Sequence, residues 1–148
     1  MPGRMTTPIS VIGDKLTSAV EAKMLSIAKA LCYVGELCLI EARDGGTYED
    51  RSGNLRSSIG YAVLINGQVL QYACVEKVKD GSEGLVQGLE YLRSRIQKAS
   101  KKGIVLIVTA GMNYAEYVET KRVVLSRAEL IAPRLVKLVL TQLGFKCK

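Results

Sequence analysis

An Asn-Gly pair at residues 66–67 separates two runs of apolar residues, and no other short stretch restricts the fold as strongly. The runs read YAVLI before the pair and QVLQYACV after it. A two-residue hairpin loop of this type needs positive φ at both positions, which Asn and Gly adopt readily. The sequence therefore predicts a β-hairpin centred on Asn66 and Gly67.

Apolar stripes with helical spacing lie on both sides of this hairpin. The first predicts one long helix from Ile9 to about Arg43, which would fall into two segments if it breaks at Gly13. The second predicts a middle helix that ends at Gly103, and the third a last helix that begins at Ser126 and contains a proline. The stripes comprise Leu16, Val20, Met24, Ile27, Leu31, Val34 and Cys38; Leu85, Leu89, Leu92, Ile96 and Ala99; and Ile131, Leu135, Leu138 and Gln142.

A continuous β-branched run at Ile104–Ala110 predicts a central strand covered on both faces. The whole pattern indicates an α+β fold: a small, mainly antiparallel sheet with a central hairpin, packed by a long N-terminal helix, a middle helix and a C-terminal helix. We expect residues 1–8 to form a flexible lead and residues 9–148 to form a single domain.

Three shorter elements complete the prediction. A short helix is expected over Leu55–Ile59, with Asp50 or Ser52 as its N-cap. Another short helix is expected after Gly111, with Asn113 as its cap. The residues 122–125 read as a brief strand.

The composition restricts the class of protein. The chain has 148 residues, of which 48% are hydrophobic and 5% aromatic, enough for one domain with an aliphatic core. No apolar stretch reaches the roughly 20 residues of a membrane span, and no signal peptide is apparent, so we expect a protein made in the cytoplasm. Four cysteines without any histidine or CxxC pair speak against a zinc site, and we read them as packing residues in a reducing compartment.

Catalytic patterns are missing. General acid–base catalysis at neutral pH most often uses histidine, which the chain lacks. Glu116 and Glu119 lie one helical turn apart, but a metal-dependent nuclease usually draws its acidic residues from strand ends, and the run Ile104–Ala110 carries none. The stretch GSEGLVQG lacks the Lys-Ser/Thr of a phosphate-binding loop. We expect no enzyme activity, cofactor or metal.

Positive charge gathers near the end of the middle helix. The formal net charge is +7. A cluster of cations could bind nucleic acid through phosphates alone, without base readout. The alternative is a solvated helix end, where the helix dipole favours cations. The cluster, a candidate contact for DNA or an acidic partner, comprises Arg93, Arg95, Lys98, Lys101 and Lys102.

Two segments carry a resemblance to a known family. DRSGNLRSSIGYAV, residues 50–63, resembles the TGxLRxSI motif of the HK97 gp10-like family of neck and tail-completion proteins of tailed bacteriophages. AGMNYAEYVE, residues 110–119, resembles the YAxYVE motif of the same family. The order and separation of the two motifs also agree, and the resemblance extends from about Ile9 to Phe145. The helix over residues 83–102 looks like an elaboration between hairpin and strand.

The resemblance implies a structural virion protein without enzyme activity, located at the head–tail junction. Such proteins assemble as homo-oligomeric rings, usually sixfold or twelvefold, between portal or adaptor and tail proteins, around the channel through which DNA passes. A net positive chain suits either an acidic neighbour or DNA. The implied candidate residues for the ring interface are Arg51, Leu55, Arg56, Tyr114, Tyr117 and Glu119.

Four of these candidates have a simpler interpretation. Arg51 and Arg56 could be solvated in a loop or could pair with Glu49 or Asp50 within the chain. Tyr114 and Tyr117 could dock their short helix onto the sheet rather than contact a second subunit. The second class of function left open by the sequence is a small basic protein that binds nucleic acid non-specifically.

Overall fold

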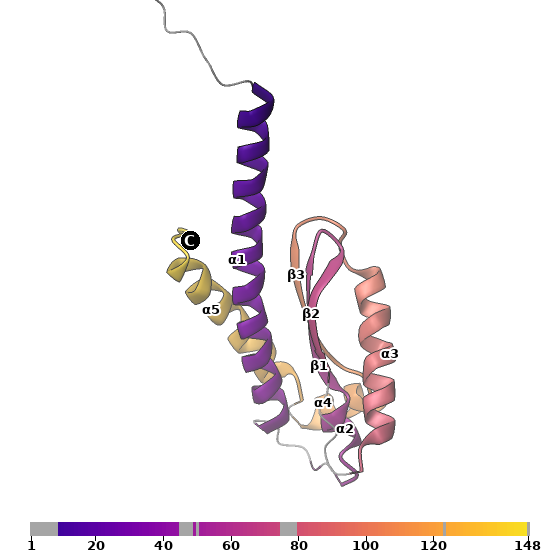
Figure 1. The fold of residues 1–148 in the computed structure, drawn as a ribbon. Helices are drawn as coiled ribbons and strands as arrows, with labels where there is room; N and C mark the ends of the chain where they lie inside the picture. Colours follow the sequence, from indigo (N-terminus) through magenta and orange to yellow (C-terminus); the bar gives the residue numbers. More distant parts are fainter. Residues whose placement is uncertain (1–8, 45–48, 50, 75–79, 123, 148) are drawn as a thin grey trace, which may run out of the picture.

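The computed structural model describes residues 9–44, 49, 51–74, 80–122 and 124–147, and leaves the side chains of residues 72–74 and 121 undescribed. A three-stranded antiparallel sheet, ordered β2-β1-β3, has helices on both faces (Figure 1). This arrangement confirms the predicted α+β fold class. The predicted lead at residues 1–8 lies outside the described residues. The elements are α1 (Ile9–Asp44), α2 (Asn54–Ser57), β1 (Ile59–Ile65), β2 (Gln68–Cys74), α3 (Ser82–Lys98), β3 (Ile104–Ala110), α4 (Ala115–Lys121) and α5 (Ser126–Gln142).

The predicted hairpin is confirmed. Asn66 has φ 50° and Gly67 has φ 82°, the positive values that a two-residue loop of this type requires. Asn66 also ties the loop to the start of β3, because its backbone N–H donates to the Gly103 carbonyl at 2.8 Å and its side-chain oxygen accepts from the Gly103 N–H at 2.9 Å. The turn therefore fixes the register of both strand pairs.

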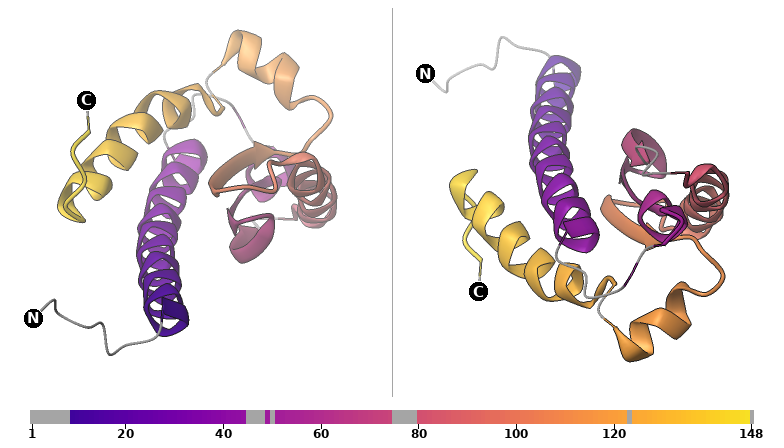
Figure 2. Two further views of the ribbon diagram at one scale, coloured as in Figure 1. Left: turned by 90° about the horizontal axis from the view of Figure 1, so that it is seen from above. Right: turned by 90° about the horizontal axis from the view of Figure 1, so that it is seen from below.

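The two faces of the sheet are covered by different helices (Figure 2). Residues of β1 alternate between them: Tyr61 and Val63 belong to the larger core beneath α1, α4 and α5, whereas Ala62 and Leu64 pack with Leu92 of α3. All four β1 residues are fully buried, so β1 is the centre of the molecule.

Helix α1 is continuous through Gly13, so the break that the sequence allowed at this residue does not occur. Only its C-terminal half packs against the sheet, since its buried residues run from Ala28 to Ala42. The predicted apolar stripe nevertheless extends further: Leu16 is 63% exposed and Val20 is 58% exposed. The N-terminal half of α1 thus projects beyond the rest of the protein with its apolar stripe uncovered (Figure 1).

The prediction for residues 104–110 is wrong in one respect. The central strand is β1, and β3 pairs with it on one side only, so β3 is an edge strand. The apolar run suggested a central strand because helices cover both faces of β3. A strand with two covered faces is apolar throughout, whether or not both of its edges are paired.

Several predicted boundaries also need correction. Helix α2 ends at Ser57, because Ile59 already belongs to β1, and Gly53 with φ 81° occupies its N-cap position without a side-chain cap. Asp50 lies outside the described residues. Helix α3 ends at Lys98 rather than at Gly103, whose φ of 79° instead turns the chain into β3.

The C-terminal third differs in three places. Tyr114, not Asn113, is the N-cap residue of α4, and it makes no side-chain capping bond. The described residues of segment 122–125 form bends rather than a strand. Helix α5 begins at Ser126 as predicted, but Leu138 is 54% exposed and Val139 is buried in its place, so the helix is rotated relative to the predicted stripe.

Candidate functional site

The two segments that carry the family resemblance meet at one end of the sheet. Strand pairing places Ile59 opposite Ala110, and the Gly111 N–H donates to the Ser58 carbonyl at 3.1 Å. Ser58 is itself fully buried, and its hydroxyl donates to the Leu55 carbonyl at 2.7 Å. Residues 51–63 and 110–119 therefore form one structural unit, which we call the motif junction.

Glycines of α3 allow this helix to lie directly on the motif junction. A Cβ atom on Gly84 would collide with the backbone of Asn54, and one on Gly111 would lie 2.5 Å from the Gly88 Cα atom. The Gly84 N–H also donates to the Asn54 side-chain oxygen at 3.1 Å. Close backbone contact is thus the role of the glycines in GSEGLVQG, a role that sequence reasoning missed when it tested the stretch only as a phosphate loop.

Glu119 holds the start of α5. One carboxylate oxygen accepts from the backbone N–H groups of Val124 (2.9 Å) and Leu125 (2.6 Å), and the other accepts from the Ser126 N–H (3.2 Å). Partial burial alone would raise the pKa of Glu119, but the hydrogen bonds from the side chain of Ser126 and from these N–H groups together lower it. Glu119 was predicted as an interface residue. In the structure its side chain, which belongs to α4, caps the N-terminus of α5.

The other interface candidates separate into buried and exposed residues. Leu55 is only 2% exposed and belongs to the core, so it is not available to a second subunit as the chain stands. Tyr117 is 61% exposed and Tyr114 is 38% exposed, which leaves both rings accessible on α4. Arg51 is exposed and lies 3.8 Å from Glu49, the intrachain pair anticipated as the simpler interpretation. Arg56 is half-buried on α2.

The predicted basic cluster does not form one surface. Arg93 and Lys98 are five residues apart on α3, which places them about 140° apart around the helix axis. Arg95 and Lys98 line the β3 side of α3, where the Arg95 guanidinium lies over the Tyr91 ring at 5.8 Å. Lys101 reaches the hairpin loop beside Gly67, and Lys102 is exposed before β3. The charge is therefore spread around one end of the sheet.

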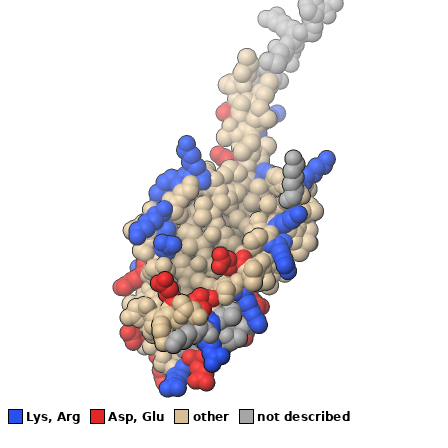
Figure 3. Space-filling model, turned by 180° about the vertical axis from the view of Figure 1, so that it is seen from behind, with Lys and Arg blue, Asp and Glu red and all other residues tan. Residues whose placement is uncertain are grey.

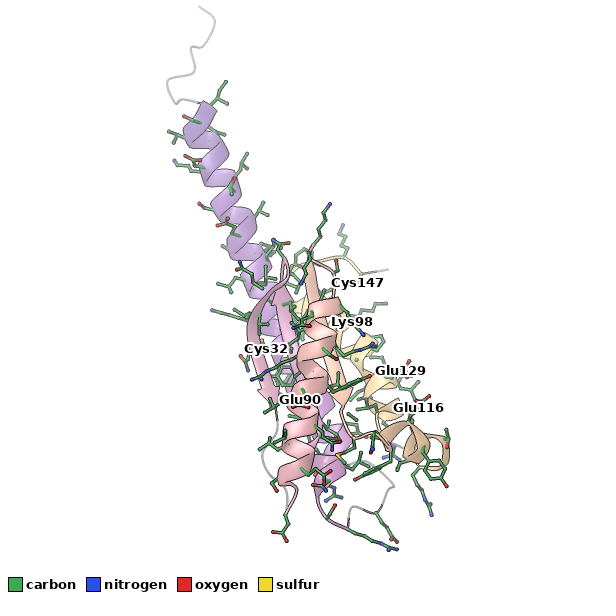
Figure 4. The ribbon with its side chains drawn as sticks, turned by 90° about the vertical axis from the view of Figure 1, so that its right-hand side faces the viewer. Cys32, Glu90, Lys98, Glu116, Glu129 and Cys147 are labelled. Atoms are coloured by element: carbon green, nitrogen blue, oxygen red, sulfur yellow. The ribbon has the colours of Figure 1, made fainter. Side chains whose placement is uncertain are left out.

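A groove of about 820 Å³ follows the free edge of β3. Its floor is formed by Val105–Ala110, and one rim carries Arg95 and Lys98 from α3. The opposite rim carries Glu116 of α4 and Glu129 of α5. Figure 3 looks onto this face, where an uncharged surface has basic side chains on both flanks and acidic side chains toward its lower end, and Figure 4 labels Lys98 on α3 and Glu116 and Glu129 on the α4 and α5 side.

The groove deepens on the α5 side into an apolar pocket of about 500 Å³. Leu106 and Val108 of β3 form one wall, and Ala132 and Val136 of α5 form the other. The only polar side chain of the strand lies on the opposite face: Thr109 is 5% exposed, and its hydroxyl has no hydrogen-bond partner among the described residues. An apolar groove with a backbone edge as its floor suits a polypeptide strand better than a small polar substrate.

The buried titratable groups of the larger core are Tyr61, Cys32 and Cys38. The Tyr61 hydroxyl donates to Glu36 at 2.6 Å and accepts from the Gln71 amide at 3.0 Å. Burial, together with the hydrogen bond to Glu36 and the charge of that carboxylate, raises the pKa of Tyr61. Burial also raises the pKa values of the free thiols of Cys32 and Cys38, which makes both poor nucleophiles.

The described residues contain neither a candidate metal site nor a candidate membrane-spanning helix. Across residues 9–147, apart from the undescribed gaps, no group of three or more His, Cys, Asp or Glu is placed to hold a metal ion. None of the described helices is long and apolar enough to cross a membrane.

Comparison with known protein families, curated proteins and solved structures finds no match to the chain.

Proposed function

We propose that this chain is a structural virion protein of a tailed bacteriophage and forms part of an oligomeric ring at the head–tail connector, around the DNA channel. The observation that carries the proposal is the motif junction. Segments 50–63 and 110–119, which resemble neck and tail-completion proteins, are far apart in the sequence but are joined through Ser58 and Gly111. The proposal depends on both segments, because a resemblance in one segment alone would not be accompanied by this contact between the two.

The distribution of apolar surface supports assembly. The projecting half of α1 exposes Ile9, Leu16 and Val20, and α4 exposes Tyr117 at a different place on the molecule. Uncovered apolar surface of this extent is typical of proteins that bury it against partners. In the proposed ring, such surfaces contact neighbouring copies or the rings above and below.

The net charge of +7 supports a place beside DNA or an acidic portal or adaptor protein. Lys98, Lys101 and Lys102 are exposed and lie at the same end of the sheet as the hairpin loop. Contacts from flexible lysines to phosphates hold DNA without reading its sequence, as a channel lining must.

Disruption of the gene in the phage that carries it tests the proposal. We expect a lysate with DNA-filled heads and separate tails that fail to join, visible by electron microscopy, and rescue by the wild-type chain supplied in trans. Infectious particles with normally joined tails in the absence of the chain would contradict the proposal.

The alternative function is non-specific nucleic-acid binding by a free protein. The observation in its favour is the stacking of Arg95 on Tyr91 beside Lys98, which combines cations with an aromatic ring in one groove. A free binding protein would be abundant in the infected-cell lysate and absent from purified particles, which distinguishes it from the connector protein.

A further inference from the structure

Strand β3 is an unprotected sheet edge. Seven consecutive pairs join it to β1 without a bulge, and its sequence IVLIVTA contains no charge and no proline. Soluble proteins normally protect such edges with charges, prolines, bulges or a covering segment. The other edge strand, β2, carries one irregularity, between its pairings with Val63 and Leu64, and is regular over residues 71–74. Strand β3 is therefore the longer regular edge, and residues 71–74 are the regular part of the β2 edge.

The hydrogen bonds at both ends of β3 show which backbone groups are available. Gly111 donates to Ser58, and Asn66 donates to Gly103, so Gly103 and Gly111 both point toward β1. Since hydrogen-bonding direction alternates along a strand, residues 105, 107 and 109 also point toward β1. The N–H and C=O groups of residues 104, 106, 108 and 110 point away from it, toward the groove. A strand laid in the groove can use them all.

We propose that this groove receives the β2 edge of a second copy of the chain, so that the sheet continues head to tail from one copy to the next. The inference rests on the proposed function, because it names the contact through which the ring closes. A contact between two different surfaces of the same chain generates a ring when the rotation closes, whereas a contact between identical surfaces stops at a dimer.

The symmetric alternative, in which the β3 edges of two copies pair with each other, requires a twofold axis perpendicular to the sheet and stops at a dimer. It would leave the exposed apolar residues Val69 and Leu70 of both copies uncovered, whereas the head-to-tail contact covers them.

The β2 side of the molecule carries exposed apolar residues that can cover the groove of another copy. Val69 and Leu70 of β2 are exposed apolar residues, and so are Tyr33 and Ile40 of α1. Tyr33 lies three residues before Glu36 and Ile40 four residues after it, so both share one side of α1 with Glu36. This is the side toward β2, because Glu36 accepts from the Tyr61 hydroxyl, which in turn accepts from Gln71 of β2. This apolar flank is the surface that would cover Leu106 and Val108 of the next copy, with Lys29, on the same side of α1, toward the acidic rim.

The direction of the new pair follows from the topology. Strands β2 and β3 are both antiparallel to β1, so they run parallel to each other. A sheet that continues in the same sense therefore pairs β3 with the β2 of the next copy in parallel.

Photo-crosslinking of the full-length chain in infected cells and in purified particles tests this contact. The photoreactive amino acid p-benzoylphenylalanine replaces Leu70, and the control replaces Leu138, which is also exposed but lies on α5. We expect the Leu70 variant to give chain–chain adducts mapped by mass spectrometry to residues 104–110 or to the α3 wall of the groove. Adducts between two β2 strands, adducts mapped elsewhere, or the absence of chain–chain adducts would overturn the proposal.

A second variant tests the contact without the crosslinker. Leu70→Lys should reduce incorporation into particles at least tenfold relative to Leu138→Lys, while circular dichroism of the two purified chains stays the same. Equal incorporation would overturn the proposal. The outcomes separate the two claims: adducts in the groove with no chain in virions contradict only the connector function, and virions that contain the chain with adducts elsewhere contradict only this contact.

Discussion

Replacing Glu119 by Gln keeps the size of the side chain but removes the charge that holds the start of α5. The carboxylate accepts three backbone N–H groups between 2.6 and 3.2 Å. Hydrogen bonds to a charged group contribute about 1.5–3 kcal/mol, against about 0.5–1.5 kcal/mol for neutral ones. Since Gln retains one acceptor oxygen and the site is partly exposed, we expect a loss of about 1–2 kcal/mol in the free energy of unfolding.

Urea denaturation followed by circular dichroism measures this loss, with Glu116→Gln as the matched control. Glu116 lies on the same helix and is exposed, so its replacement should change the free energy of unfolding by less than about 0.5 kcal/mol. Equal, small effects of both replacements at neutral pH would refute the assignment of Glu119 as the cap of α5.

The same pair of variants has a defined pH dependence. The pKa of Glu119 is lowered in the folded chain, so its stabilising effect is fully present above the ordinary glutamate value of about 4.3 and is lost as the pH falls through the folded-state value. The difference in stability between wild type and Glu119→Gln should therefore shrink in acid. A difference that stays constant down to the lowest pH at which the chain folds would contradict this reasoning.

Three further predictions concern the core, the motif junction and the basic residues. Tyr61→Phe removes the donor to Glu36 and should cost about 1.5–3 kcal/mol in urea denaturation, whereas Tyr33→Phe, at an exposed position, should cost almost nothing. Gly84→Ala should cost about 1–3 kcal/mol because the backbone of Asn54 blocks the new Cβ atom, whereas Gly13→Ala, with open space around it, should stabilise the chain by up to about 1 kcal/mol. Reversal of charge at Lys98, Lys101 and Lys102 should weaken DNA binding and lower its salt slope by about 0.9 for each phosphate that is no longer neutralised, as measured by fluorescence anisotropy; an unchanged slope would exclude these lysines from the DNA interface.

The sequence carried enough information for the hairpin and for the approximate positions of the three long helices. Asn66 and Gly67 specify their own backbone geometry, and a helical stripe is a local property of the chain. Strand order is not local. Nothing in the run Ile104–Ala110 distinguishes a central strand from an edge strand whose faces are both covered, and for that reason the free edge of β3 was not predicted.

The candidate site was predicted less completely than the fold. The exposure of Tyr114 and Tyr117 agrees with the proposed interface, but Leu55 is buried and Glu119 is bonded within its own chain. A side chain that accepts bonds from residues five to seven positions ahead has no sequence signature, because the turn between the two helices creates the contact. The glycine spacing at 81, 84 and 88 was the visible signal of close helix packing, and its meaning depended on knowing what α3 contacts.

Quantitative mass spectrometry of gradient-purified phage particles tests the central claim most directly. Full virions, tail-less heads and free tails are compared for peptides of this chain, with the major capsid protein as the internal standard. The connector account predicts a few to a dozen copies per virion, of the order of one or two sixfold rings, retained by either the heads or the tails. Peptides found only in the infected-cell lysate, and not in any particle fraction, would contradict it.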